Sequence, residues 1–166
     1  MITHLDSLPA HSKRMVILLL LSGISVNKLC SLPFDCLVRD PHGVWFLCFD
    51  TSKMPIKYTI SLSPVALAMI QEQQQALKQD QHGVTNLLFL NSKGQTVSPK
   101  TFMAQLNRLA VNKNICDASG QVWRFRSHQF RYTLGAQMIN ENVPFQVITR
   151  QLGHQVASTT LRYVRI

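Results

Sequence analysis

A run of seven apolar residues, Met15 to Leu21, limits most strongly how this chain can fold. It follows Lys13 and Arg14 and so mimics a signal peptide, but it is at the short limit for such a segment and far too short to span a bilayer. A helix through this run is apolar on nearly all sides, so other parts of the chain must cover it. We therefore expect a core helix from about residue 10 to Leu21, in a cytoplasmic protein.

Size and charge indicate one domain with a polyanionic partner. The 166 residues are 46% apolar and 15% charged, which is typical of a single globular domain. The net charge is +9, and from Gln121 to the end there are six arginines and one acid, Glu141. A solvated surface could carry this excess, but a basic patch that faces a polyanion is the better interpretation.

The cysteines and histidines do not form a metal-binding pattern. Four cysteines show no CxxC pair, and they predict small core residues in a reducing compartment: Cys30, Cys36, Cys48 and Cys116. No HExxH or paired ligand spacing occurs, and carboxylates are scarce near the C-terminal histidines. We expect neither a metal nor any other cofactor.

Helix starts and apolar spacing predict a mostly helical chain. Ser12 is a candidate cap of the core helix, and a short helix is expected over residues 26–31. Ser63-Pro64 and Ser98-Pro99 each predict a helix start, because serine caps and proline suits the first turn. Further helices are expected over residues 128–141, with Ser127 as its cap, and over residues 144–153. A last short helix is expected to contain Thr160 and Tyr163.

Two apolar, β-branched or aromatic runs predict a hairpin. Residues 44–49 read as a buried strand and residues 58–62 alternate as a second strand, so the loop between them presents Lys53. The expected fold class is therefore mainly α with a small antiparallel β-sheet.

Four side chains near the C-terminus recur with fixed gaps. His128 and Arg131 are three apart, His154 follows Arg131 by 23, and Tyr163 follows His154 by nine. Taken singly, each has an ordinary explanation: a helix-start histidine, a histidine that serves a helix end, or a packing tyrosine with a wet hydroxyl. Taken together, they are three donors that can bind a phosphate and one hydroxyl that can attack it.

This spacing resembles the catalytic box of the tyrosine recombinases, the phage integrase family. The matching motifs are H-x-x-R at 128–131, L-G-H at 152–154 and T-T-L-R-Y at 159–163. Upstream, SGISVNKLCSLPFD (22–35) is similar to that family's T-G-x-R-x-S-E-L-x-x-L-x-x-x-D turn. WFLCFDTSKMPIKYTISLSP (45–64) is similar to its β-hairpin, whose loop carries a catalytic lysine. The resemblance covers about residues 10–165 and implies a tyrosine-recombinase catalytic-domain fold.

The resemblance implies a role for each matching residue. Tyr163 is the implied nucleophile that forms a 3′-phosphotyrosyl bond to DNA, while Arg131 and His154 donate to the phosphate. Lys53 is the implied proton donor to the leaving 5′-oxygen, with Lys57 as the alternative, and His128 assists proton transfer. Arg124, Arg126 and Arg162 are expected to bind DNA.

One position departs from the family pattern. The first catalytic arginine is replaced by Ser25, and Lys28 stands where the family usually has Glu. Losing one oxyanion donor typically costs about 10² to 10³ in rate, roughly 3 to 4 kcal/mol. Three accounts stay open: a slow or inactive relative that still binds DNA, an altered copy, or Lys28 as a substitute cation. The third requires residues 25 and 28 to point at the same spot.

The predicted function is site-specific DNA recombination of integrase or transposase type, on double-stranded DNA and in a homo-tetramer. No membrane and no small-molecule substrate are expected. Residues 1–166 are expected to be one catalytic domain without the family's N-terminal DNA-clamping domain. Two rivals stay open: an inactive DNA-binding or accessory protein of the same fold, and a type IB topoisomerase.

Overall fold

The computed structural model describes residues 2–51, 54–80 and 85–152. A 3₁₀ helix η1 (Ile2–Ser7) is followed by α1 (Ala10–Ser22), α2 (Val26–Cys30) and the strands β1 (Leu37–Arg39), β2 (Trp45–Thr51) and β3 (Met54–Ser61). The remaining elements are α3 (Pro64–Gln79), α4 (Pro99–Asn112), α5 (Ser127–Asn140) and α6 (Phe145–Gln151). The described part is mainly helical with a small sheet, as the sequence predicts.

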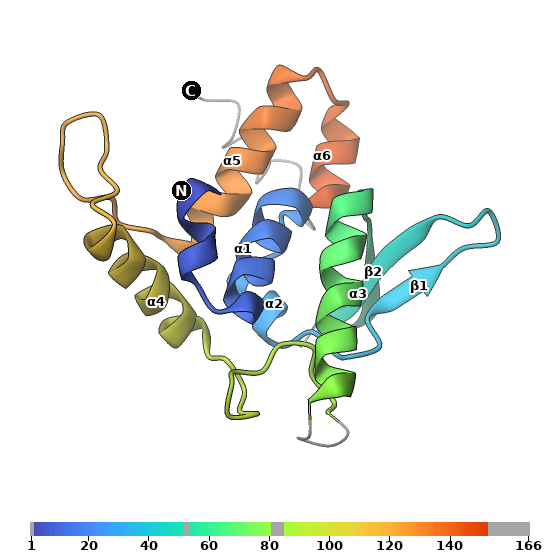
Figure 1. Ribbon diagram of the computed structural model, residues 1–166. Coiled ribbons are helices and arrows are strands. Elements are labelled where there is room, and N and C mark those ends of the chain that lie inside the picture. The colour runs from blue at the N-terminus through green and yellow to red at the C-terminus, as the bar shows by residue number, and fades with distance from the viewer. Residues whose placement is uncertain (1, 52–53, 81–84, 153–166) are drawn as a thin grey trace.

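Helix α1 forms the centre of the core. Met15, Val16, Leu18 and Leu19 are at most 1% exposed, and α3 and α5 pack against this helix (Figure 1). The other fully buried large side chains come from all parts of the described chain, among them Leu29, Leu47, Ile70, Phe89, Phe102 and Leu106. Most of the apolar run is therefore covered by the rest of this domain, although Leu21 is 39% exposed. Among the described residues, none of the helices has the length and apolar character needed to span a membrane.

Serine caps set the starts of three helices. Ser63 and Ser98 accept hydrogen bonds from the N–H groups of Ala66 and Thr101, each followed by the predicted proline. Ser25 caps α2 in the same way, by accepting from the N–H of Lys28 at 3.3 Å. Each cap satisfies an N–H group that has no partner inside the helix.

Two predicted caps are wrong. Ser12 lies inside α1, where it is buried and its hydroxyl donates to Gln105 Oε1 at 2.6 Å. Ser127 is the first residue of α5 rather than its cap. The helix begins one residue earlier than predicted because the Gln129 side chain accepts from the N–H of Arg126 at 3.1 Å and so closes the first turn.

Other boundaries differ by a residue or two. Pro144 is the N-cap of α6, which ends at Gln151. The predicted end at Gly153, and the predicted last helix with Thr160 and Tyr163, lie outside the described residues.

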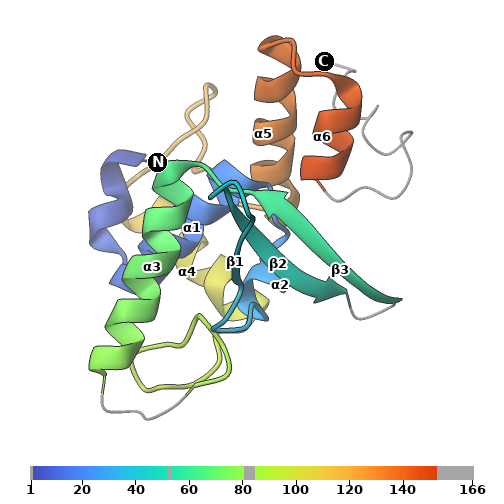
Figure 2. The ribbon, with the colours of Figure 1, turned by 90° about the vertical axis from the view of Figure 1, so that its right-hand side faces the viewer.

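The sheet has three antiparallel strands in the order β1–β2–β3. Leu47 pairs with Ile60 and Phe49 with Tyr58, and the register shifts between Asp50 and Thr51. Figure 2 shows the β2–β3 ribbon extending from the helical body, with α6 near β3. The hairpin is confirmed, but β1 was not predicted, because three residues are too few to show a period.

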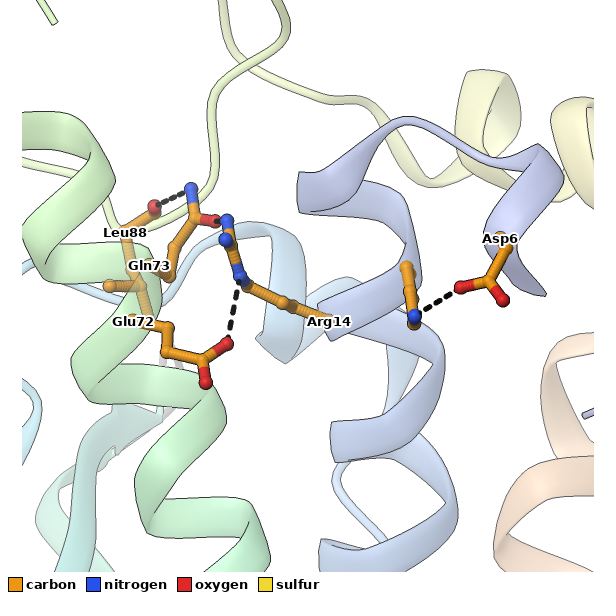
Figure 3. A network of polar contacts seen from close by, with 6 residues as sticks. Asp6, Arg14, Glu72, Gln73 and Leu88 are labelled. Atoms are coloured by element: carbon orange, nitrogen blue, oxygen red, sulfur yellow. Dashed lines mark hydrogen bonds and ion pairs between the residues drawn. The ribbon is translucent and has the colours of Figure 1, made fainter.

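A polar network joins α1 to α3 beside the core (Figure 3). Arg14 Nη1 donates to Gln73 Oε1 at 2.9 Å, and Gln73 Nε2 donates to the Leu88 carbonyl at 3.1 Å. Arg14 also lies 3.6 Å from a carboxylate oxygen of Glu72. Gln73 is only 2% exposed, so both ends of its amide must be paired, as they are.

Only part of the predicted core assignment holds. Cys30 and Cys36 are buried, but Cys48 is half-buried and Cys116 is exposed, in a loop after α4. Apolar residues outside the core include Val65, which is 56% exposed at the start of α3, and Met138 of α5, which is half-buried. Loop ends and first helical turns face solvent even where their residues are apolar.

The cysteines should therefore react in a fixed order. Burial raises the pKa of the Cys30 thiol to about 11 and that of Cys36 to about 12, so both stay protonated near pH 8. Under native conditions we expect iodoacetamide to modify Cys116 first and to leave Cys30 and Cys36 unmodified until denaturant is added. Peptide mass spectrometry would measure this. Native alkylation of Cys36 as fast as Cys116 would contradict the burial.

Candidate active site

The loop that leaves α1 fits closely against α5 and α6. Gly23 has φ +71°, and a Cβ atom built on it would lie 2.8 Å from Leu134 Cδ2 and 2.8 Å from Leu152 Cδ2. Contacts this short leave room only for glycine, and the backbone angle also favours it. The residues of the S-G-I-S turn are thereby held next to the middle of α5 and the end of α6.

Two polar contacts fasten the same three segments. Gln151 Nε2 donates to the Ser22 carbonyl at 3.0 Å, which joins the ends of α1 and α6. The Arg131 guanidinium of α5 donates to the carbonyl of Leu152, the C-cap of α6. Arg131 is half-buried. Its guanidinium contacts Leu152, the residue that directly precedes Gly153-His154 in the sequence.

Ser25 and Lys28 lie at the start of α2, directly after this loop. The cap bond from the Lys28 N–H to Ser25 Oγ joins the two residues across the first turn of the helix. The Lys28 ammonium lies over the Phe49 ring of β2, 5.0 Å from its centroid. Partial burial, and secondly the positive charge of Arg131, lower the pKa of Lys28.

The basic residues before α5 gather at its N-terminal end. Arg124, Arg126 and His128 are all exposed. Gln129 Nε2 donates to the Arg124 carbonyl at 3.2 Å, in addition to its contact with the Arg126 N–H. Asn107 of α4 exchanges two hydrogen bonds with the backbone of the residue between the two arginines, at 2.7 and 3.3 Å. This loop is held by its backbone, with its charged groups in solvent.

The structure brings only some of the predicted site residues together. Arg131 and Lys28 interact electrostatically, and Ser25 lies one helical turn from Lys28. His128 is on the same helix as Arg131, at a more exposed position. The other predicted site residues lie outside the described residues: Lys53, His154, Arg162 and Tyr163.

Three residues that position this site were not identified from the sequence. Gly23, Gln151 and Leu152 join the α1–α2 loop to α5 and α6 through contacts between residues more than a hundred positions apart. The only available signals were the fixed glycine and leucine of the two matched motifs. Among the described residues, no group of three or more His, Cys, Asp or Glu side chains could hold a metal ion.

This arrangement suits an anion that carries several oxygens. Arg131 offers a planar set of five donors, of which the Leu152 carbonyl uses only a part. Lys28 adds a second cation near it, and both groups are partly buried, where charges act more strongly than in bulk water. A phosphate group matches that combination.

Comparison with known proteins agrees with this geometry. The model of the phage integrase family matches residues 1–166. The chain belongs to the phage integrase family. Transposase B from transposon Tn554 of Staphylococcus aureus (strain Mu50) is 32% identical over 99% of this chain, which spans 26% of that relative. Tyrosine recombinase XerC of Anoxybacillus flavithermus is 21% identical over 93% of the chain and 50% of the relative. The chain thus spans about a quarter of the transposase and half of XerC.

Solved structures show the same fold. XerH site-specific recombinase in a pre-cleavage complex with its difH substrate superposes with a TM-score of 0.77, at 14% identity, over 99% of this chain and 47% of that one. The Tn1549 transposon integrase in complex with transposon right end DNA gives 0.70, at 18% identity, over 93% and 54%. The predicted fold class, a tyrosine-recombinase catalytic domain, is therefore confirmed.

Gly23→Ala should test the close approach at the site. The left-handed backbone angle costs about 1 to 2 kcal/mol for a residue with a Cβ atom, and overpacking against Leu134 and Leu152 adds about 1 to 3 kcal/mol. Gly120→Ala is the matched control, because Gly120 has φ +86° and no atom within 4 Å of its Cβ position. Urea unfolding should show the larger loss for Gly23→Ala, and equal losses would contradict the tight fit.

Proposed function

We propose that this chain is the DNA-breaking and rejoining domain of a site-specific recombinase, of integrase or transposase type, that acts on double-stranded DNA. The observation that carries the proposal is the position of Arg131, whose guanidinium binds the carbonyl directly before the G-H of the family's catalytic box. Family membership supports it over the whole chain. So do the names of a transposase relative and of recombinases solved with DNA.

The proposed reaction exchanges one phosphoester bond for another. The phenol oxygen of Tyr163 forms a bond to the phosphorus, the bond to the 5′-oxygen breaks, and a 3′-phosphotyrosyl intermediate and a 5′-hydroxyl result. The phenol proton leaves to a base, and the departing oxygen takes up a proton. Attack by a 5′-hydroxyl reverses these steps. The energy of the phosphodiester is conserved, so neither ATP nor a metal is required.

Each proposed side chain has one task in this exchange. Arg131 and His154 donate to the nonbridging oxygens, where negative charge develops. Lys53, or Lys57 in its place, protonates the leaving 5′-oxygen, and His128 assists proton transfer at the phosphate. The exposed side chains of Arg124 and Arg126 support contacts to flanking phosphates, and Arg162 is assigned the same task from its place in the sequence.

We further propose a homo-tetramer on DNA, because two duplexes each cut on two strands need four such domains. One domain alone should bind DNA weakly, since a protein that neutralises few phosphates gains little from counterion release. Partner copies and further segments of the protein would supply the remaining contacts.

One observation favours a second function. Ser25 occupies the position of the first catalytic arginine, and its hydroxyl oxygen is used as the cap of α2. A chain with one phosphate donor fewer suits a DNA-binding or accessory role without strand cleavage. The two functions differ in whether the tyrosine ever forms a covalent bond to DNA.

The substitution Tyr163→Phe distinguishes the strand-cleaving function from the DNA-binding one. On nicked suicide duplexes tiled over the DNA that flanks its gene, the wild-type chain should form a covalent adduct. The short fragment between the cleaved bond and the nick carries the 5′-hydroxyl and diffuses away, so that religation is prevented. Tyr163→Phe should form none, since it lacks the attacking oxygen. The adduct would be measured by denaturing gel shift and by mass spectrometry of the labelled peptide.

Tyr132→Phe is the matched control, because Tyr132 is an exposed tyrosine on α5, next to Arg131 in the sequence. It should give the wild-type amount of adduct. Absence of any Tyr163 adduct, in the wild type and in Ser25→Arg alike, would establish the accessory role instead.

A further inference from the structure

We propose that Lys28 is a catalytic residue, the second cation of the phosphate site, and that it acts together with Arg131 in place of the arginine missing at position 25. Lys28 would hold a nonbridging oxygen of the scissile phosphate while Tyr163 attacks. It would transfer no proton and remain an ammonium throughout the exchange. This inference rests on the proposed recombinase function and names a residue for it.

The position of Lys28 is set by contacts that also set Arg131. Gly23 touches Leu134 and Leu152, and the Leu152 carbonyl accepts from Arg131. The loop that begins α2 is thus fixed against the very residue that binds the arginine. Ser25 then holds the backbone of Lys28 through the cap bond. A chain of direct contacts therefore runs from Arg131 to the turn that carries the lysine.

The Lys28 side chain packs against an aromatic ring of the sheet. Its ammonium lies 5.0 Å from the centroid of Phe49, a buried ring of β2. A cation over an aromatic face is attracted to that face, which restricts where the ammonium lies. Ser25 and Lys28 are joined by the cap bond in the first turn of α2, so a long side chain at 28 starts near the position from which an arginine at 25 would have reached the site.

The electrostatics agree with an anion at this place. Burial and the charge of Arg131 both disfavour the charged form of Lys28 and lower its pKa. An anion between the two groups would favour the charged form of Lys28, because it attracts each cation and offsets their mutual repulsion. Two cations held close together in a partly buried site are suited to a ligand that carries more than one anionic oxygen.

The first test measures DNA binding without a specific site. The affinity of a 20-base-pair duplex would be measured by fluorescence anisotropy over a range of salt concentrations. Lys28→Met should weaken binding and reduce the slope of log K against log[salt] by about 0.9, the value for one lost phosphate contact. Lys78→Met is the matched control, because Lys78 also lies over a phenylalanine ring, Phe34, at 5.9 Å. It lies near the end of α3 that points away from α5 (Figures 1 and 2).

The second test measures covalent adduct on the nicked duplexes. Lys28→Met should slow adduct formation about 10² to 10³-fold, and Lys28→Arg should stay within about tenfold of the wild type. Lys28→Glu alone should be inactive, whereas Lys28→Glu combined with Ser25→Arg restores the family's usual pair and should recover activity.

The outcomes separate the two proposals. If the wild type and the Ser25→Arg/Lys28→Glu pair form the adduct but Lys28→Met is as fast as the wild type, Lys28 has no catalytic role and the recombinase function stands. An unchanged salt slope in Lys28→Met likewise overturns the phosphate contact. If no variant forms a Tyr163 adduct, the recombinase function fails, and the role of Lys28 fails with it.

Discussion

The burial of one long stretch of α1 is the constraint on which the rest of this domain depends. Met15, Val16, Leu18 and Leu19 are buried, and α3 and α5 pack against this helix. The helix then ends at a glycine whose backbone and tight contacts fix the following turn. The position of the candidate site therefore follows from how the core helix ends, because the turn after α1 is held against α5 and α6.

Some residues of the candidate site make two structural contacts each. Leu152 packs on Gly23 through its side chain and accepts from Arg131 through its carbonyl. Ser25 ends the turn and caps α2. Such double use makes a network rigid, because moving one element breaks a packing contact and a hydrogen bond at once. It also means that a change at residue 23 should disturb the guanidinium without touching it.

Local features could be predicted from the sequence, and long-range ones could not. The core helix, the Ser63-Pro64 and Ser98-Pro99 starts and the hairpin follow from propensity and periodicity within a few residues. The cap at Ser127 was wrong because the Gln129 side chain competed for the same turn. The approach of Arg131 to Lys28 follows from no local rule. The family resemblance supplied the catalytic residues, but only the fold shows that residues 28 and 131 act on each other.

We interpret the two differences from the family pattern, at positions 25 and 28, as one coupled change. The family pattern places Arg and Glu there, and this chain has Ser and Lys. Serine is the better helix cap, so the turn gains a local bond while the arginine is lost. Lysine at the third helical position is locally unfavourable, because the free N–H groups of a first turn favour an acid. It is further opposed by burial and by Arg131. In the proposed site, a bound phosphate would offset the effects of burial and of Arg131 on the Lys28 charge.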